Sequence, residues 1–166
     1  MASRFRNWLH DPVEIVQGAE IGPGDTVLEV GCGSGFFTIP AARRVGASGQ
    51  LVAMDVLPAY VDRVSQSAPA AGLENVRALE GDALATGLDD ASMDAVMLFG
   101  VIPFPTLPLD RLLPEVHRIL RPRGILAVWL FPSALWVPRS IARSGLFEQV
   151  SKRNGVYNYR RCAARS

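Results

Sequence analysis

The stretch that most constrains the fold of this chain covers residues 26–38 and reads TVLEVGCGSGFFT. Its first five residues are mostly apolar or β-branched, which predicts a short buried strand with Glu29 near its end. Gly31, Gly33 and Gly35 follow at alternate positions, and a helical pattern begins directly after them. A strand, a glycine turn and a helix in succession place backbone N–H groups and the positive end of the helix beside one cavity. The sequence therefore predicts a cofactor site at the carboxyl end of a first strand.

The spacing of the glycines helps to identify the cofactor. A dinucleotide-binding loop reads G-x-G-x-x-G/A, which from Gly31 requires a small residue at position 36. Phe36 stands there, and the third glycine comes one residue early. Glu29, two residues before the first glycine, has no part in that pattern either. A nicotinamide or flavin oxidoreductase is therefore disfavoured, although it is kept as an alternative.

The rest of the chain alternates between predicted strands and helices. Strands are predicted over residues 51–55, 76–80, 94–100 and 125–131, and helices from Pro12 and over about 36–45, 58–67, 109–120 and 133–144. Residues 147–153 and 156–160 form a predicted hairpin, because the intervening Asn-Gly suits a type I′ turn. The order predicts an α/β fold with a doubly wound, mostly parallel sheet that has helices on both faces and one antiparallel strand.

Two prolines are expected to disturb these helices. Pro40 falls in the first turns of the helix after the glycine loop, so that turn is expected to loosen or the helix to start later. Pro114 interrupts the helix over 109–120 and is expected to kink it. Asp11 followed by Pro12 is a favourable start for the first helix. The arm of residues 1–20, with Phe5 and Trp8, is either a lid over the site or a packing helix.

Length and composition favour one cytoplasmic domain over residues 1–166. The longest apolar runs, 95–104 and 125–131, are too short to span a membrane. The first ten residues lack the apolar core of a signal peptide, and two cysteines give neither a disulfide framework nor a zinc pattern. Residues 1–110 carry 6 basic and 14 acidic side chains, and residues 111–166 carry 11 and 2. We expect the two parts to neutralise each other within one sheet. Sixteen of the 17 basic residues are Arg, which we interpret as a compositional bias and not as nucleic-acid binding.

Several motifs in register resemble those of one enzyme family. The glycine loop with its acidic strand end resembles motif I of the class I S-adenosylmethionine (SAM) dependent methyltransferases. The chain is most similar to small "type 11" and ubiquinone/menaquinone-biosynthesis enzymes. The matching pieces are VLEVGCGSGFFTIP from residue 27, VAMD from 52, GLENV from 72, GDA from 81 and EVHRILRP from 115.

The resemblance implies a sheet order of 3-2-1-4-5-7-6 and a set of residues that bind SAM. The loop Gly31, Cys32, Gly33 and Gly35 would wrap the methionine part, with Glu29 below its amino group. Asp55 would accept hydrogen bonds from both ribose hydroxyls, and Val56 would press on the adenine face. Asp82 and the Ala83 amide would meet the adenine edge, and Phe99 would line the methionine side. From the residues alone, Asp55 is favoured by its place twenty residues beyond Gly35, whereas Glu29, Asp82 and Phe99 could equally be structural.

The chain also departs from this family. Relatives often carry His, Asp or Glu just after the fourth strand, but the loop over 101–108 reads VIPFPTLP and leaves no evident catalytic residue. Arg123 replaces a common glycine in the turn before the fifth strand. The resemblance implies a methyltransferase for a small-molecule acceptor, with no metal and with the N-terminal arm or a homodimer partner completing a shallow pocket. A SAM-binding subunit or sensor without catalysis is the alternative.

Overall fold

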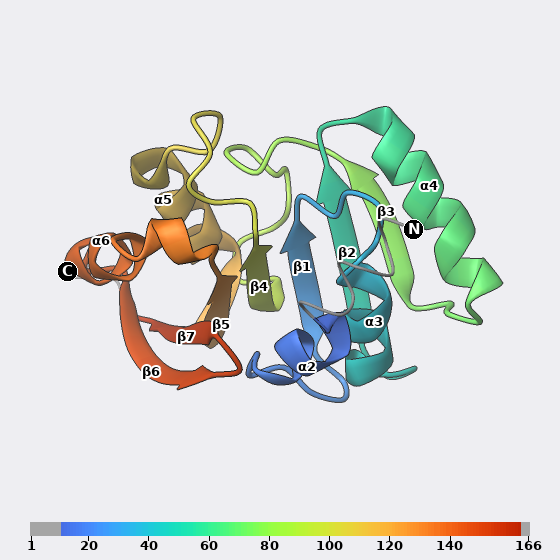
Figure 1. The fold of residues 1–166 in the computed structure, drawn as a ribbon, viewed down its shortest axis with the longest axis horizontal. Coiled ribbons are helices and arrows are strands. Elements are labelled where there is room, and N and C mark those ends of the chain that lie inside the picture. Colours follow the sequence, from blue (N-terminus) through green and yellow to red (C-terminus); the bar gives the residue numbers. More distant parts are fainter. Residues whose placement is uncertain (1–10, 164–166) are drawn as a thin grey trace.

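The computed structural model describes residues 11–163, which form a seven-stranded sheet flanked by helices (Figure 1). The order is β3-β2-β1-β4-β5-β7-β6, and β7 runs antiparallel to both of its neighbours. The strands are β1 (Thr26–Val30), β2 (Gln50–Asp55), β3 (Val76–Glu80), β4 (Met93–Phe99), β5 (Leu120–Trp129), β6 (Phe147–Arg153) and β7 (Val156–Arg161). The predicted sheet order is confirmed. So is the predicted hairpin, in which Asn154 and Gly155 have φ of 49° and 77°, as a type I′ turn requires.

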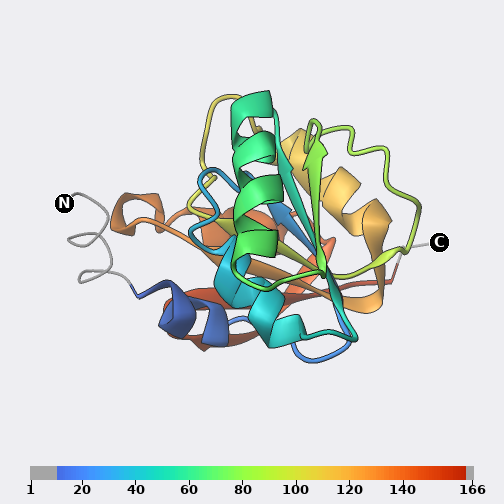
Figure 2. The same ribbon diagram turned by 90° about the vertical axis from the view of Figure 1, so that its right-hand side faces the viewer.

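Helices cover both faces of this sheet, because the side chains of each parallel strand alternate between two hydrophobic clusters. In β1, Val27 packs with residues of α2 (Pro12–Gln17) and α3 (Thr38–Val45), while Leu28 packs with residues of α5 (Leu109–Ile119) and α6 (Val137–Arg143). The remaining helix, α4 (Pro58–Ala70), contacts β2 and β3. Figure 2 shows α3 and α4 together on one side of the strands. The central strands β1, β2 and β4 are therefore buried from both sides, which agrees with their mostly apolar residues.

The helices confirm the predictions in one place and differ from them in two. The helix after the glycine loop starts at Thr38, so Pro40 lies in a first turn whose N–H groups need no helical partner, and the expected later start is confirmed. The prediction that Pro114 interrupts α5 is wrong, because the helix continues through this exposed position. The predicted helix over 133–144 is divided into a short 3-10 turn, η1 (Pro132–Ala134), and α6.

The last residues of the N-terminal arm, 18–20, pack against the hairpin through the side chain of Asn158. This buried amide donates to the Gly18 carbonyl at 2.8 Å and accepts from the Glu20 N–H at 2.9 Å. The Asp11 side chain caps α2 by accepting from the Val13 N–H at 2.9 Å, as predicted. Phe5, Trp8 and His10 lie outside the described residues, so the lid over the site stays a prediction.

The predicted turn before β5 is part of the strand itself, as an irregular segment. Met93 pairs with Leu120 and Ala95 with Ile125, so residues 121–124 bulge out of the register with β4. Arg123 has φ of 66° in this bulge. A residue with a Cβ is strained in this region by about 1–2 kcal/mol. The conformation explains why glycine suits this position.

We predict that Arg123→Gly raises the free energy of unfolding by about 0.5–1 kcal/mol, because relief of left-handed strain exceeds the added entropy of the unfolded chain. Urea denaturation monitored by circular dichroism measures the change. Arg121→Gly is the matched control: it should destabilise, because Arg121 has no positive φ and pairs with Asp94 at 2.8 Å. A destabilised Arg123→Gly protein would contradict the prediction.

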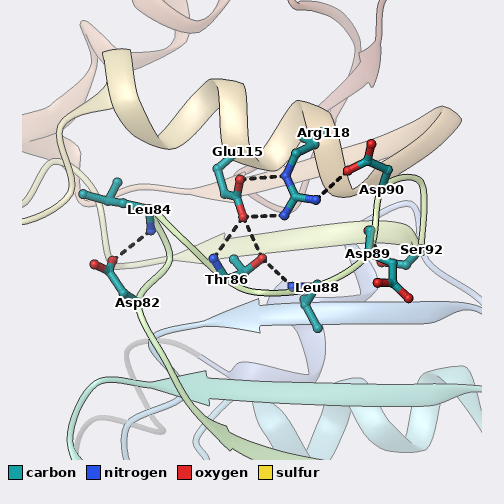
Figure 3. Close-up of polar contacts among 9 residues, drawn as sticks. All are labelled: Asp82, Leu84, Thr86, Leu88, Asp89, Asp90, Ser92, Glu115 and Arg118. Atoms are coloured by element: carbon teal, nitrogen blue, oxygen red, sulfur yellow. Dashed lines mark hydrogen bonds and ion pairs between the residues drawn. The ribbon is translucent and has the colours of Figure 1, made fainter.

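The loop between β3 and β4 is held onto α5 by a carboxylate (Figure 3). Glu115 accepts from the backbone N–H and hydroxyl of Thr86 at 2.9 and 2.7 Å. Its carboxylate also receives two hydrogen bonds from Arg118, which reaches on to Asp90. These hydrogen bonds, those from Arg118 above all, lower the pKa of Glu115 from 4.5 to about 2. The network fixes the middle and later part of the connection from β3 to β4, at Thr86 and Asp90, against α5.

We predict that Glu115→Gln lowers the free energy of unfolding by about 1–2 kcal/mol at pH 7, the range for hydrogen bonds to a charged group after allowance for the partly exposed Arg118. Because the folded pKa is depressed, the stabilisation is present above pH 4.5 and is lost as the pH falls toward 2. Urea midpoints at pH 7 and pH 3.5 should therefore differ more in the parent protein than in the variant. Glu148→Gln, at an exposed position of β6, should match the parent protein at both pH values.

Candidate functional site

The loops that follow β1, β2 and β4 meet at one edge of the sheet, the upper edge in Figure 1. This is the edge at which the parallel strands have their carboxyl ends, and ligands of open α/β sheets bind there. The order of the strands puts β1 beside both β2 and β4, so the glycine loop lies between the two neighbouring loops.

The glycine loop is fixed by the end of β2. The N–H groups of Gly31 and Cys32 both donate to the Met54 carbonyl, at 2.8 and 3.0 Å. Gly31, Gly33 and Gly35 all have positive φ, between 52° and 87°. At Gly31 a Cβ would also lie 2.5 Å from the Val101 side chain, so this position needs glycine for space as well as for conformation.

Asp55 joins the glycine loop to the start of α4. Its two carboxylate oxygens accept the N–H groups of Gly33 and Leu57, each at 3.0 Å. An ionised carboxylate offers about four acceptor positions, so Asp55 retains the capacity to accept further hydrogen bonds from a ligand. The sequence predicted the ligand role but not this structural one.

A cavity of about 410 Å³ opens between these loops. Five of the predicted residues line it: Gly31, Asp55, Val56, Asp82 and Ala83. The other lining residues are Val30, Met54, Gly81, Phe104, Thr106 and Leu107. The Asp82 side chain caps its own turn by accepting from the Leu84 N–H at 2.9 Å. Asp82 therefore has a structural role besides the ligand role that the sequence predicts. We call this space the first cavity.

A larger hollow, of about 600 Å³, lies elsewhere, between the end of α3 and the turn after α4. It contains none of the predicted site residues and lies at the amino ends of β2 and β3. The first cavity is instead the one at which the strand ends, the positive-φ Gly31 and the carboxylate of Asp55 coincide.

Glu29 is a buried carboxyl group beneath the glycine loop, only 2% exposed. One oxygen accepts from the Thr38 hydroxyl at 3.0 Å, while Oε2 has no hydrogen-bond partner among the described residues. Burial raises its pKa to about 8, and the nearby Asp55 charge acts in the same direction. A buried carboxyl group with one unpaired oxygen costs free energy in folding, which is typical of a group kept for a ligand.

Cys32 is buried in the glycine loop, and burial together with Glu29 and Asp55 raises its pKa to about 12. It therefore remains a thiol at neutral pH, which suits a small residue in a tight loop and disfavours a redox role.

Aromatic side chains line a second, smaller cavity of about 200 Å³ next to the glycine loop. Phe99 is buried in the core and also lines this cavity, so its position is compatible with a structural role and with contact to a ligand. Phe37 contacts Phe99 edge-to-face with ring centroids 5.2 Å apart, and Trp129 contacts Phe131 at 5.3 Å. The remaining lining residues are Ser34, Phe36 and Gly100.

Sequence reasoning missed several residues of this site. Thr38, which holds Glu29, and Met54, which holds the glycine loop, act through burial and a backbone carbonyl that no motif reveals. Trp129 was missed because its place beside Phe99 depends on the register of β4 and β5. Two exposed aromatic residues from the connections after β4 and β5 also belong to the cavities: Phe104 lines the first and Phe131 the second.

Other candidate residues lie away from the two cavities. Leu135 and Trp136 instead face a surface hollow with Arg139, Ser140 and Arg143. His117 contacts the Cys162 carbonyl at 2.9 Å and the Phe147 ring, so its observed contacts are structural ones. Among the described residues no group of three or more His, Cys, Asp or Glu side chains is arranged to hold a metal ion.

Comparison with known proteins identifies the class that this site and fold define. Residues 27–124 match the family model described as "Methyltransferase domain". A SAM-dependent methyltransferase from Aquifex aeolicus has the same fold, with a TM-score of 0.77 over 94% of this chain and 91% of that one, at 22% identity. The chain belongs to the methyltransferase-domain family, and its fold is the Rossmann-like fold of the SAM-dependent methyltransferases.

The most similar curated relatives act on different acceptors. A demethylmenaquinone methyltransferase from Geobacillus stearothermophilus is 30% identical over 73% of this chain and 51% of its own length. An arsenite methyltransferase from Halobacterium salinarum is 29% identical over 66% of this chain and 28% of its own length. The chain thus spans about half or less of these relatives. The family therefore indicates SAM as the methyl donor and leaves the acceptor open.

Proposed function

We propose that this protein is a SAM-dependent methyltransferase that acts on a small molecule. The observation that carries the proposal is the first cavity, where Asp55 and the glycine loop of a methyltransferase-domain protein meet. SAM, when bound, supplies a methyl group on a sulfonium whose departure leaves a neutral thioether. The fit is good: the cavity is lined by Gly31, which has positive φ, and by the acceptor carboxylate of Asp55. Glu29 does not line the cavity, but it keeps an unpaired oxygen beneath the glycine loop.

The roles proposed for Gly31, Asp55, Val56, Asp82 and Ala83 are supported by their place in the lining of the first cavity. The other roles rest on the family alone. Asp55 would accept the two ribose hydroxyls with its remaining lone pairs, and the 63% exposed Val56 would cover the adenine face. Asp82 and the Ala83 N–H would meet the adenine edge. Gly31, Cys32, Gly33 and Gly35 would surround the methionine part, with Glu29 below its ammonium group and Phe99 at its side.

The chain's own contribution to catalysis is then positioning. None of the residues that line the second cavity is an acid or a base, and the loop over 101–108 has none either. Holding two reactants in line can by itself supply several orders of magnitude in rate. The same absence supports the second candidate, a SAM-binding subunit or sensor without catalysis.

We also infer a cytoplasmic protein whose acceptor is a small molecule and not a nucleic acid, with a homodimer as one way to complete the pocket. Cysteine usage supports the compartment, since Cys32 and Cys162 are both free thiols. No helix in residues 11–163 is long and apolar enough to cross a bilayer.

We predict that Asp55→Ala weakens SAM binding by about 1.5–3 kcal/mol, the range for hydrogen bonds to a charged group. Isothermal titration calorimetry gives the affinity. The variant should also unfold earlier, because the N–H groups of Gly33 and Leu57 lose their acceptor, so circular dichroism must show that it is folded at the titration temperature. Asp62→Ala, on the exposed side of α4, should bind SAM as the parent protein does. Unchanged affinity in a folded Asp55→Ala protein would remove Asp55 from the site.

We predict further that SAM binding releases about one proton at pH 7. Glu29 is mostly protonated there because its pKa is about 8, and the ligand's ammonium group favours the carboxylate. Affinity should therefore rise with pH below 8, by up to about tenfold per unit, and level off above it. Calorimetric titrations in buffers of different ionisation enthalpy measure the number of protons that are released on binding.

Glu29→Gln is the control for this proton, because it keeps the shape of the side chain and should bind with no release. NAD should not bind to either protein. Binding of NAD in preference to SAM would contradict the proposed function, and SAM binding without proton release would remove Glu29 from the ammonium site.

A further inference from the structure

The second cavity has a wall made of rings. It is lined by five aromatic side chains, from Phe36, Phe37, Phe99, Trp129 and Phe131. Adjacent rings among them meet edge-to-face or tilted, with centroids 4.9–5.7 Å apart. These side chains present both ring edges and ring faces to a bound ligand. A planar aromatic ligand can therefore contact them in the offset or edge-to-face arrangements that aromatic pairs prefer.

The size of this cavity limits its occupant. Its volume is about 200 Å³, and a dry apolar cavity of about 150 Å³ is known to hold one benzene molecule. One substituted ring therefore fits. The cavity is bordered by Phe131, which is 48% exposed, so a longer substituent has to leave through the mouth beside this side chain.

The chemistry of the lining further limits the acceptor. Ser34 supplies the one side-chain hydroxyl of the lining, and no lining residue accepts a proton near neutral pH. A protonated amine has no lone pair and needs a base before it can react, and its charge is repelled by the sulfonium of the donor. An acceptor that is already an anion needs no proton transfer, and the sulfonium attracts it.

We propose that the second cavity is the acceptor subsite, and that it takes a single-ring aromatic anion such as an electron-poor phenolate or thiophenolate. This inference rests on the proposed function. A lone pair of the acceptor's oxygen or sulfur forms the new bond to the methyl carbon, and the electron pair of the broken C–S bond stays on the donor sulfur. The products are a neutral aryl methyl ether or thioether and S-adenosylhomocysteine, with no proton left to move.

Binding can be tested apart from turnover. The protein is saturated with S-adenosylhomocysteine and titrated with 4-nitrophenol, with cyclohexanol and benzylamine as comparison ligands. We expect 4-nitrophenol to bind and the other two to bind at least tenfold more weakly. Phe131→Ala should weaken 4-nitrophenol binding about three- to tenfold, which is the aromatic pair contribution of about 0.5–1.5 kcal/mol expressed as a ratio.

Trp136→Ala is the matched control for Phe131→Ala. Both side chains are about half exposed and come from the same connection after β5, but Trp136 does not line the second cavity. It should therefore leave the affinity for 4-nitrophenol unchanged. Phe131→Leu, which keeps apolar bulk without the ring, should give an intermediate affinity.

Turnover is then followed with labelled SAM. At a SAM concentration that saturates the protein at every pH, methylation of 4-nitrophenol should rise with pH up to the pKa of the phenol, with no group of the enzyme visible in the profile. Equal losses in the Phe131→Ala and Trp136→Ala variants, or faster methylation of benzylamine, would overturn the inference. Tight SAM binding with no binding of 4-nitrophenol would also overturn it but leave the proposed function standing, whereas failure to bind SAM would contradict both.

Discussion

The arrangement of the site depends on the end of β2. The Met54 carbonyl and the Asp55 carboxylate together accept three consecutive N–H groups of the glycine loop, those of Gly31, Cys32 and Gly33. Because β1 and β2 are adjacent and parallel, their carboxyl ends arrive side by side and make these short hydrogen bonds possible. The loop is therefore held open by its neighbour before any ligand binds, and preorganisation of this kind lowers the cost of binding.

The glycine loop covers a group that weakens the folded state. Glu29 is fully buried, has one unpaired oxygen and stays protonated well above the usual range for a carboxyl group. The Thr38 hydroxyl compensates only part of that cost. Local rules are often broken at functional sites, and here the loop, the buried carboxyl group and Asp55 form one unit. The charge of Asp55 contributes to the raised pKa of Glu29. A cationic group placed between the two carboxyl groups would therefore offset the repulsion between them.

The uneven charge of the chain has a structural counterpart. The acidic first part and the basic last part are interleaved, and ion pairs join them at Asp90 with Arg118 and at Asp94 with Arg121. The first of these pairs extends the Glu115 network that positions the loop before β4 (Figure 3). The expectation that the two parts neutralise each other within one sheet is therefore supported by contacts between them, although exposed pairs of this kind add little stability individually.

The sequence by itself determined the strands, the hairpin turn and the cofactor loop, because each depends on residues close together in the chain. The strand Val76–Glu80 was predicted with its observed bounds, because a run of mostly apolar residues is visible in the sequence itself. The hairpin around Asn154 and Gly155 was predicted to within one residue at each strand end, because the positive φ of its turn depends on these two residues alone. Asp55 was found because it ends a predicted strand, and Glu29 because it lies next to the end of one. Only the tertiary structure decided what surrounds them: the Met54 carbonyl, the Thr38 hydroxyl and the ring of Trp129 reach the site through strand register and burial. Those contacts join segments far apart in the chain, and no local pattern encodes the distance between them.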